Sequence, residues 1–291
     1  MKRFILPLTG FLLCFLLDSS WPALAQQDPD DRKMNGPMEP FRIMGNLYYV
    51  GASDVTAYLI TGPRGHILID GGYRETASRI LANIRKLGFR PRDVRILLIN
   101  HAHYDHCGGL AQIKRVTHAR LLASPGDAPV LEDGGKSDFY FGSRGKLFPP
   151  VHVDSLLQDG QVIRLGPLAL TTYFTPGHTR GATSWEFSLT DSGRTYQVVI
   201  ASSLTTLDYA LTGQEAYPHI AADFRQSFTT LDRIHPDIFL ASHGQFFDLL
   251  RRARDLRAGV RPNPFIDPEG LARYVQAMRE DFDKRWKADR P

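Results

Sequence analysis

A dense cluster of metal-capable side chains lies in the middle of the chain. The hexad His101-Ala102-His103-Tyr104-Asp105-His106 holds three imidazoles and one carboxylate within six positions. It directly follows the apolar run 94–100, which predicts a buried strand. Because alternate side chains at a strand end point the same way, His101 and His103 can meet one ion. The turn that follows would bring Asp105 and His106 to a second ion, so the spacing predicts half of a dinuclear metal site.

The ligand types favour zinc. Neutral imidazoles with one carboxylate suit zinc, whereas magnesium and calcium prefer shells of oxygen atoms, and structural zinc sites are usually rich in cysteine. The alternative is that a few of the ten histidines cluster by chance. A lone surface histidine is usually only solvated or hydrogen-bonded, but the hexad is too dense for that interpretation to be preferred.

Two further histidines occupy similar positions. His178 follows the strand-like run 168–174, and His243 follows the run 237–240. Taken alone, each would more often be structural. Since several strand ends can converge on one rim, we expect His178 and His243 to lie beside the hexad.

These motifs together resemble a known family. The chain is similar to the metallo-β-lactamase-fold hydrolases and, within them, to the zinc β-lactamases of the third subclass. The resemblance runs from about Phe41 to the C-terminus, and its motifs are Asn46-Leu47-Tyr48-Tyr49-Val50-Gly51, Leu68-Ile69-Asp70-Gly71-Gly72, the hexad, Pro176-Gly177-His178-Thr179 and Ser242-His243-Gly244. It implies one catalytic domain over 41–291, folded as a four-layer αβ/βα sandwich with the metal ligands at one edge of two sheets.

The resemblance also implies a ligand set, a cofactor and a substrate. Two zinc ions per chain would be bound by two sets of side chains: His101, His103 and His178 for one ion, and Asp105, His106 and His243 for the other. Zinc lowers the pKa of bound water toward ~7, so a bridging hydroxide could attack the carbonyl of a small-molecule β-lactam antibiotic. Asp105 would also orient that hydroxide, which makes it a catalytic residue as well as a ligand.

Four further residues have predicted roles around the metals. Asp70 follows the run 67–69 and either orients a metal-bound imidazole or only stabilises its own turn, and the sequence leaves both open. In the family, a serine-rich segment binds the substrate carboxylate and a nearby tyrosine assists at the oxyanion. Ser203 and Thr205 match as substrate contacts and Tyr209 as the catalytic tyrosine, although serines and threonines in a row are most often turn residues.

The same segment distinguishes rival functions. Glyoxalase-II-like thioesterases and quorum-quenching lactonases share the hexad but typically have a bridging aspartate here, where this chain has Ser202 and Ser203. Serine in this region also fits the third subclass, since another subclass has a metal-binding cysteine. A secreted zinc hydrolase of another ester, lactone or thioester remains the alternative, and a catalytically silent metal-binding protein is the second.

The N-terminus predicts export. Two basic residues precede an apolar stretch over 4–17 that is too short to span a bilayer, and the small residues Ala23 and Ala25 fit a cleavage site. We therefore expect a signal peptide over 1–25, cleaved after Ala25, and an arm over 26–40 that is mobile at its start. The mature protein would be periplasmic, without stable membrane insertion.

Charge and cysteine content limit the binding partners and the cross-links that the sequence allows. The net charge of +4 at pH 7, without a long basic block, gives no reason to expect nucleic acid binding, and a monomer is expected. Only Cys107 would remain after export, so no intramolecular disulfide is available. Because Cys107 follows His106 directly, it could be a thiolate ligand, but a small buried apolar residue is the preferred interpretation.

The rest of the sequence predicts the scaffold. Strands are expected over 47–50, 57–61, 66–70, 119–123, 162–165, 168–174, 185–188 and 197–201, with helices over 75–87, after Gly109 and from an N-cap at Asp267. Two loops, 134–150 and 207–217, carry aromatic residues that could form a wall over the metal site. Their alternative role is ordinary packing.

Overall fold

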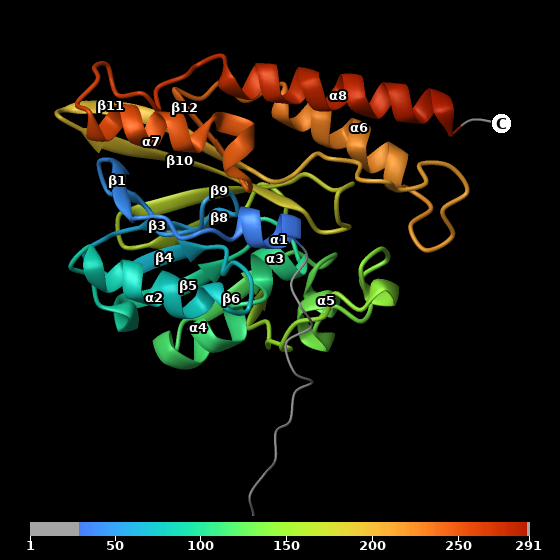
Figure 1. The fold of residues 1–291 in the computed structure, drawn as a ribbon, viewed down its shortest axis with the longest axis horizontal. Coiled ribbons are helices and arrows are strands. Elements are labelled where there is room, and N and C mark those ends of the chain that lie inside the picture. The colour runs from blue at the N-terminus through green and yellow to red at the C-terminus, as the bar shows by residue number, and fades with distance from the viewer. Residues whose placement is uncertain (1–28, 290–291) are drawn as a thin grey trace, which may run out of the picture.

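Two sheets face one another in the computed structural model, which describes residues 29–289 (Figure 1). The seven-stranded sheet follows chain order: β1 (Phe41–Met44), β2 (Leu47–Tyr49), β3 (Tyr58–Ile60), β4 (His66–Ile69), β5 (Val94–Leu98), β6 (Arg120–Ala123) and β7 (Ser155–Leu156). The five-stranded sheet has the order β12 (Ile238–Ala241), β11 (Arg194–Ala201), β10 (Thr183–Asp191), β9 (Leu168–Phe174) and β8 (Val162–Leu165). Strands β4 to β7 run parallel, as do β11 and β12, and the other pairs are antiparallel.

Helices cover the outer face of each sheet (Figure 1). α2 (Thr76–Lys86) and α4 (Leu110–Thr117) lie on the first sheet, and α6 (Ile220–Leu231), α7 (Leu249–Arg257) and α8 (Gly270–Ala288) lie on the second. The shorter elements are α1 (Pro29–Met34), α3 (Tyr104–Cys107), α5 (Ala128–Asp133) and the 3-10 turns η1 (Pro91–Asp93), η2 (Gly142–Arg144) and η3 (Gly244–Phe247). The predicted four-layer αβ/βα sandwich is confirmed. Among the described residues, no helix is long and apolar enough to cross a membrane.

The apolar pattern of the strands explains the layers. All four residues of β4 are buried, as expected for a strand covered on both faces. One apolar core lies between the sheets and includes Trp185, and a second lies between the first sheet and its helices and includes Ile80 and Ile113. The two cores hold the sheets and helices against one another. This packing also fixes the position of the loops at the common edge of the two sheets.

Most predicted elements are present within a few residues of their expected bounds, but the start of the last helix was wrong. α8 begins at Gly270, and the expected N-cap residue Asp267 does not cap it with its side chain. The Asp267 carboxylate instead accepts hydrogen bonds from Arg252 and Arg273. The predicted apolar stripe of this helix does pack into the core, where Leu271, Val275 and Phe282 are fully buried.

The N-terminal predictions fall largely outside the described residues. The signal peptide over 1–25 and the first part of the arm belong to residues 1–28, which the structure does not describe. From Pro29 onward the arm forms α1 and continues to β1, with Asp31 and Asn35 buried.

Candidate metal centre

The hexad leaves β5 as the sequence predicts. β5 ends at Leu98, His101 and His103 follow, His103 in extended conformation, and α3 begins at Tyr104. Close packing holds this turn, because a Cβ at Gly109 would lie 2.3 Å from the carbonyl oxygen of Gly71. Only glycine at this position allows the turn after β4 to approach the hexad so closely.

Asp70 fixes the start of the hexad loop. Its backbone has φ 66°, and its carboxylate accepts hydrogen bonds from the backbone and side-chain nitrogens of Asn100 at 2.7 and 2.9 Å. Its Oδ2 also lies 3.2 Å from Nδ1 of His106. Of the two roles that the sequence left open, the structure shows the contact to a hexad imidazole, and the remaining bonds of the carboxylate reach Asn100, just after β5, and not its own turn.

Three imidazoles form the first ligand group. His101, His103 and His178 are buried, and one ligand atom from each lies within 4.8 Å of the others. His178 arrives from the second sheet, after β9, and its Nδ1 contacts the carbonyl oxygen of Thr205 at 2.7 Å. This contact leaves Nε2 of His178 for the metal side of the ring.

The second group lies beside the first. Ligand atoms of His101, Asp105 and His106 also lie within 4.8 Å of one another. His243, which follows β12, places its Nε2 3.1 Å from Nε2 of His106 and 3.5 Å from Oδ2 of Asp105. The structure thus brings together all six histidine and aspartate side chains that the resemblance assigned to metal binding: His101, His103, Asp105, His106, His178 and His243.

Two carboxylates that the sequence analysis missed lie behind these imidazoles. Asp54 Oδ2 is within hydrogen-bond distance of Nδ1 of His243, at 2.8 Å, whereas Asp138 Oδ2 lies 3.6 Å from Nε2 of His103, which has no hydrogen-bond partner among the described residues. Metal-bound imidazoles usually contact an acceptor through their other nitrogen, which fixes ring orientation and tautomer. Neither aspartate belongs to a motif near its histidine, so no local signal in the sequence marks the pairing.

A third buried aspartate joins the hexad to the His178 loop. Asp127 accepts hydrogen bonds from the backbone nitrogens of Ala102 and Gly181 at 2.8 and 2.9 Å and from the Thr179 hydroxyl at 3.0 Å. Like the hexad, it follows a strand end, here that of β6. That position was the one signal that could have identified it.

The donor set and its electrostatics fit a metal. Among the described residues, the buried Nε2 atom of His101 has no hydrogen-bond partner, although it lies within the cluster. Burial lowers the pKa values of His101 and His103 well below the usual value for histidine. Burial also lowers the pKa of His178, to about 4. These imidazoles are therefore neutral at pH 7, which is the form that binds metal ions.

His106 has a different electrostatic environment. Burial acts to lower its pKa, but the carboxylates of Asp105 and Asp70 outweigh burial and raise the pKa to about 10. This half of the site favours positive charge, which a metal cation would supply in place of the proton.

Comparisons with known proteins agree with this geometry. A family model described as the metallo-beta-lactamase superfamily matches residues 50–191, which include the hexad and His178. The native FEZ-1 metallo-beta-lactamase from Legionella gormanii is 43% identical to this chain, with a TM-score of 0.85. The likeness covers 88% of this chain and 98% of that one. The chain belongs to the metallo-beta-lactamase superfamily.

Further relatives lie in the same superfamily. BJP-1, a subclass B3 metallo-beta-lactamase of Bradyrhizobium japonicum, is 36% identical with a TM-score of 0.84, over 89% of this chain and 97% of that one. The expected likeness to the third subclass is thereby confirmed. A more distant relative in sequence is the N-acyl homoserine lactonase AttM from Azorhizobium caulinodans, 28% identical over 165 residues, or 48% of this chain and 61% of the relative.

The residues predicted to bind substrate surround His178 in this metallo-beta-lactamase fold. The hydroxyls of Ser203 and Thr205 lie 3.0 Å apart, and that of Thr205 lies 3.2 Å from Nδ1 of His178. The Tyr209 hydroxyl donates a hydrogen bond to the carbonyl oxygen of His178 at 3.0 Å. Ser203 and Tyr209 are each only 1% exposed, so in this conformation both hydroxyls are directed at the protein.

The two aromatic loops meet beside the first ligand group. The ring of Phe141 lies edge-on to that of His103, with centroids 4.8 Å apart. Phe139 and Tyr140 of the same loop pack on Tyr209 of the other, with centroids 4.9 and 4.7 Å away. The loops therefore pack on one another and also form an aromatic wall at the metal centre.

Cys107 lies outside both groups of clustered ligand atoms, although it directly follows His106. Its sulfhydryl donates a hydrogen bond to the carbonyl oxygen of His103 at 2.8 Å, and burial raises the pKa of the thiol well above its usual value. Cys107 is fully buried and belongs to neither group of clustered ligand atoms, which confirms the interpretation as a small buried residue.

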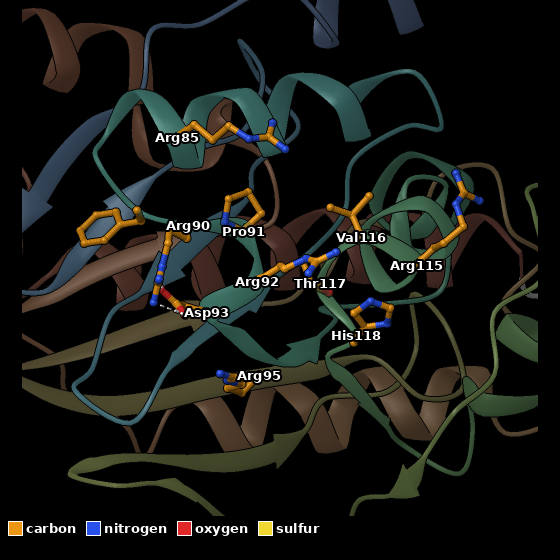
Figure 2. Close-up of a pocket in the computed structure, with 11 residues that line it drawn as sticks. Arg85, Arg90, Pro91, Arg92, Asp93, Arg95, Arg115, Val116, Thr117 and His118 are labelled. Carbon is orange, nitrogen blue, oxygen red and sulfur yellow. Dashed lines mark hydrogen bonds and ion pairs between the residues drawn. The ribbon is translucent and has the colours of Figure 1, made fainter.

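A hollow lies at the opposite end of the parallel strands from the hexad (Figure 2). This groove of about 970 Å³ is lined by the start of β5 and the ends of α2 and α4. Its arginines are spread around it, and Arg90 is paired with Asp93. Basic residues in the last turn of a helix are favoured by the helix dipole, which accounts for Arg85 and Arg115. The groove holds none of the metal-binding residues.

Proposed function

We propose that this protein is a zinc-dependent β-lactamase that hydrolyses the amide bond of β-lactam antibiotics and thereby confers resistance. The proposal rests on the complete ligand set, with three side chains on each side of a shared centre. Solved metallo-beta-lactamases that are 36% and 43% identical over nearly the whole chain support the substrate class.

The side chains divide the chemical tasks. One zinc would be held by His101, His103 and His178, and the other by the set completed by His243. When bound, zinc acts as a Lewis acid and lowers the pKa of a bound water to ~7. Asp105 lies between His106 and His243, at 3.3 and 3.5 Å, where its carboxylate can orient the nucleophile.

Other residues support the ligands and the substrate. Asp54 and Asp70 orient His243 and His106 from behind. Ser203 and Thr205 would bind the substrate carboxylate after turning from their present partners. For Tyr209, the proposed contact with the oxyanion requires its hydroxyl to leave the carbonyl oxygen of His178.

The setting of the enzyme is part of the proposal. A signal peptide over 1–25 would direct the chain to the periplasm, where an enzyme that intercepts cell-wall antibiotics is needed. Residues 41–291 would act as one catalytic domain, monomeric and without stable insertion in the membrane.

The test is steady-state hydrolysis of nitrocefin, benzylpenicillin and a carbapenem by the mature chain, with zinc added or removed by a chelator. We expect zinc-dependent turnover with kcat/KM of roughly 10⁴ M⁻¹s⁻¹ or more. His243→Ala should abolish most of it, whereas His235→Ala, at an exposed histidine, should not.

Negligible turnover by fully zinc-loaded protein would contradict the proposal. The substrate search would then turn to thioesters and to lactones, the class named for the lactonase relative. Against that alternative, positions 202 and 203 are both serine, so this segment supplies no carboxylate between the metals.

A further inference from the structure

A carboxylate from the N-terminal arm lies beside the metal-binding turn. Asp31 of α1 is only 6% exposed. Its Oδ1 accepts hydrogen bonds from the hydroxyls of Tyr104 at 2.8 Å and Tyr73 at 3.1 Å. Its Oδ2 forms an ion pair with the ammonium of Lys146 at 2.8 Å. Three donors from three segments thus meet on one side chain.

Each donor belongs to a segment of the metal site. Tyr104 stands between the ligands His103 and Asp105 in the hexad. Lys146 belongs to the aromatic loop 134–150, and Tyr73 follows the turn that begins at Asp70. Asp31 therefore connects the arm to the hexad, to the aromatic loop and to the turn behind His106.

The connection continues to a ligand through aromatic contacts. The Lys146 ammonium lies 4.9 Å from the centroid of the Tyr104 ring. The Tyr104 ring packs edge-on against Phe141 with centroids 5.2 Å apart, and Phe141 packs against His103 at 4.8 Å. A contiguous path leads from the Asp31 carboxylate to the ring that covers the first ligand group.

The arm itself is held firmly. The backbone nitrogens of Asp54 and Val55 both donate to the carbonyl oxygen of Met34, at 3.0 and 3.2 Å. The side chain of Asn35 accepts a hydrogen bond from the Thr76 hydroxyl at 2.7 Å. The arm consequently contacts the loop that carries Asp54, the partner of His243, as well as the hexad.

The charge on Asp31 is needed for this arrangement. A buried carboxylate is costly unless it is paired and hydrogen-bonded, and here the lysine and two hydroxyls satisfy it. An asparagine would keep the shape, but it can no longer form the ion pair, and its amide donors would face an ammonium or a hydroxyl. Loss of the charge should therefore release Lys146 and the loop that carries it.

We propose that Asp31 is a positioning residue that fixes the aromatic loop 134–150 against the hexad turn, so that Phe141 covers the first metal position and supports the bound substrate. The kinetic part of this inference rests on the proposed β-lactamase function. The structural part concerns the loop alone.

The test compares Asp31→Asn with Glu39→Gln in the zinc-loaded mature chain. Glu39 is a matched control, because it also lies in the arm and pairs with the body of the protein, through Lys86, but its ion pair is exposed. The readouts are amide hydrogen exchange over 134–150, zinc content, and the separate values of kcat and KM.

Asp31→Asn should speed exchange in the loop about tenfold or more, as loss of a charge-assisted hydrogen bond predicts. Zinc content should stay at the wild-type value, and KM should rise severalfold with a smaller change in kcat. Glu39→Gln should change none of these. Unaltered loop exchange in Asp31→Asn, or a kcat loss with unchanged KM, would overturn the proposal.

A second variant separates positioning from general destabilisation. If Asp31→Asn speeds exchange throughout both sheets, the same exchange is measured in Tyr104→Phe. This variant removes one hydroxyl from the carboxylate of Asp31 and keeps the aromatic ring. A local increase over 134–150 in Tyr104→Phe supports the proposal, and no local increase overturns it. If the wild type hydrolyses no β-lactam, the proposed function fails while the exchange result still decides the role of Asp31.

Discussion

The imidazoles of the metal centre depend on acceptors behind them. His243 faces His106 with one nitrogen and Asp54 with the other, and His106 in turn contacts Asp70. Each acceptor fixes a tautomer and an orientation, so that both Nε2 atoms lie on the metal side. The geometry of the centre is therefore set by carboxylates that do not bind the metal.

Replacing Asp54 tests this dependence. Asp54→Asn should weaken zinc binding at the site of His243 about 10- to 100-fold, because an amide holds the ring less firmly and without charge. Competition with a chromophoric chelator measures the change. Asp232→Asn serves as the control, since Asp232 forms an exposed ion pair with Arg279. Equal zinc affinity in the two variants would contradict the role of Asp54.

At the scale of elements, strand ends present the ligands and helix ends fix the strands. An ion pair joins α7 to the segment before α8, where Asp267 accepts hydrogen bonds from Arg252 and Arg273. Burial acts to raise the pKa of Asp267, but these arginines outweigh it and hold the pKa below its usual range. The pair keeps α7 and α8 together on the second sheet.

The pH dependence of stability follows from this shift. A carboxyl group with a lowered pKa in the folded protein contributes stability above its unfolded pKa of ~3.9, and that stability is lost as pH falls through the folded pKa. Asp267→Asn should lower the free energy of unfolding at pH 7 by about 3 kcal/mol, because the Arg252 side chain is only 7% exposed and loses its partner. The difference should shrink below about pH 4.

Urea unfolding of the metal-free protein, at pH 7 and again at a pH below about 4, measures this effect. Asp248→Asn is the control, since the Arg251 partner is about half exposed and such pairs contribute little. An Asp267→Asn difference that persists undiminished in acid would show that the charge is not the cause.

At the scale of the whole molecule, the metal centre joins the two sheets. The hexad follows β5 of the first sheet, whereas His178 and His243 follow β9 and β12 of the second. A ligand that binds only the folded chain stabilises it by mass action. Metal should therefore stabilise the sandwich as a unit and not one loop alone.

Zinc removal tests this coupling. A free zinc concentration about a thousandfold above Kd should stabilise the fold by about 4 kcal/mol, which raises Tm by on the order of 10 °C. Calorimetry with and without chelator measures it, and His178→Ala should show a smaller shift because one sheet then loses a ligand. A Tm that is the same with and without zinc would refute the coupling.

Much of the molecule could be predicted from local sequence. The hexad, the two strand-end histidines and most strands and helices depend on spacing and periodicity within a few residues, and these patterns survive without knowledge of the fold. Assigning the six ligands to two ions needed the family resemblance in addition to local spacing. The structure places all six side chains together. What the sequence by itself determined is thus the chemistry of the centre and the layers that present it.

Only the tertiary structure decided which groups support that chemistry. Asp54 and His243 are 189 residues apart, and Asp31 and Tyr104 are 73 apart, so no spacing could pair them. Asp267 illustrates the same limit. Its sequence context predicts a helix N-cap, but its carboxylate accepts hydrogen bonds from Arg252 and Arg273, which lie in two different helices. Partners of a buried charge are chosen by whichever donors the packed sheets and helices bring near, and that choice is made only on folding.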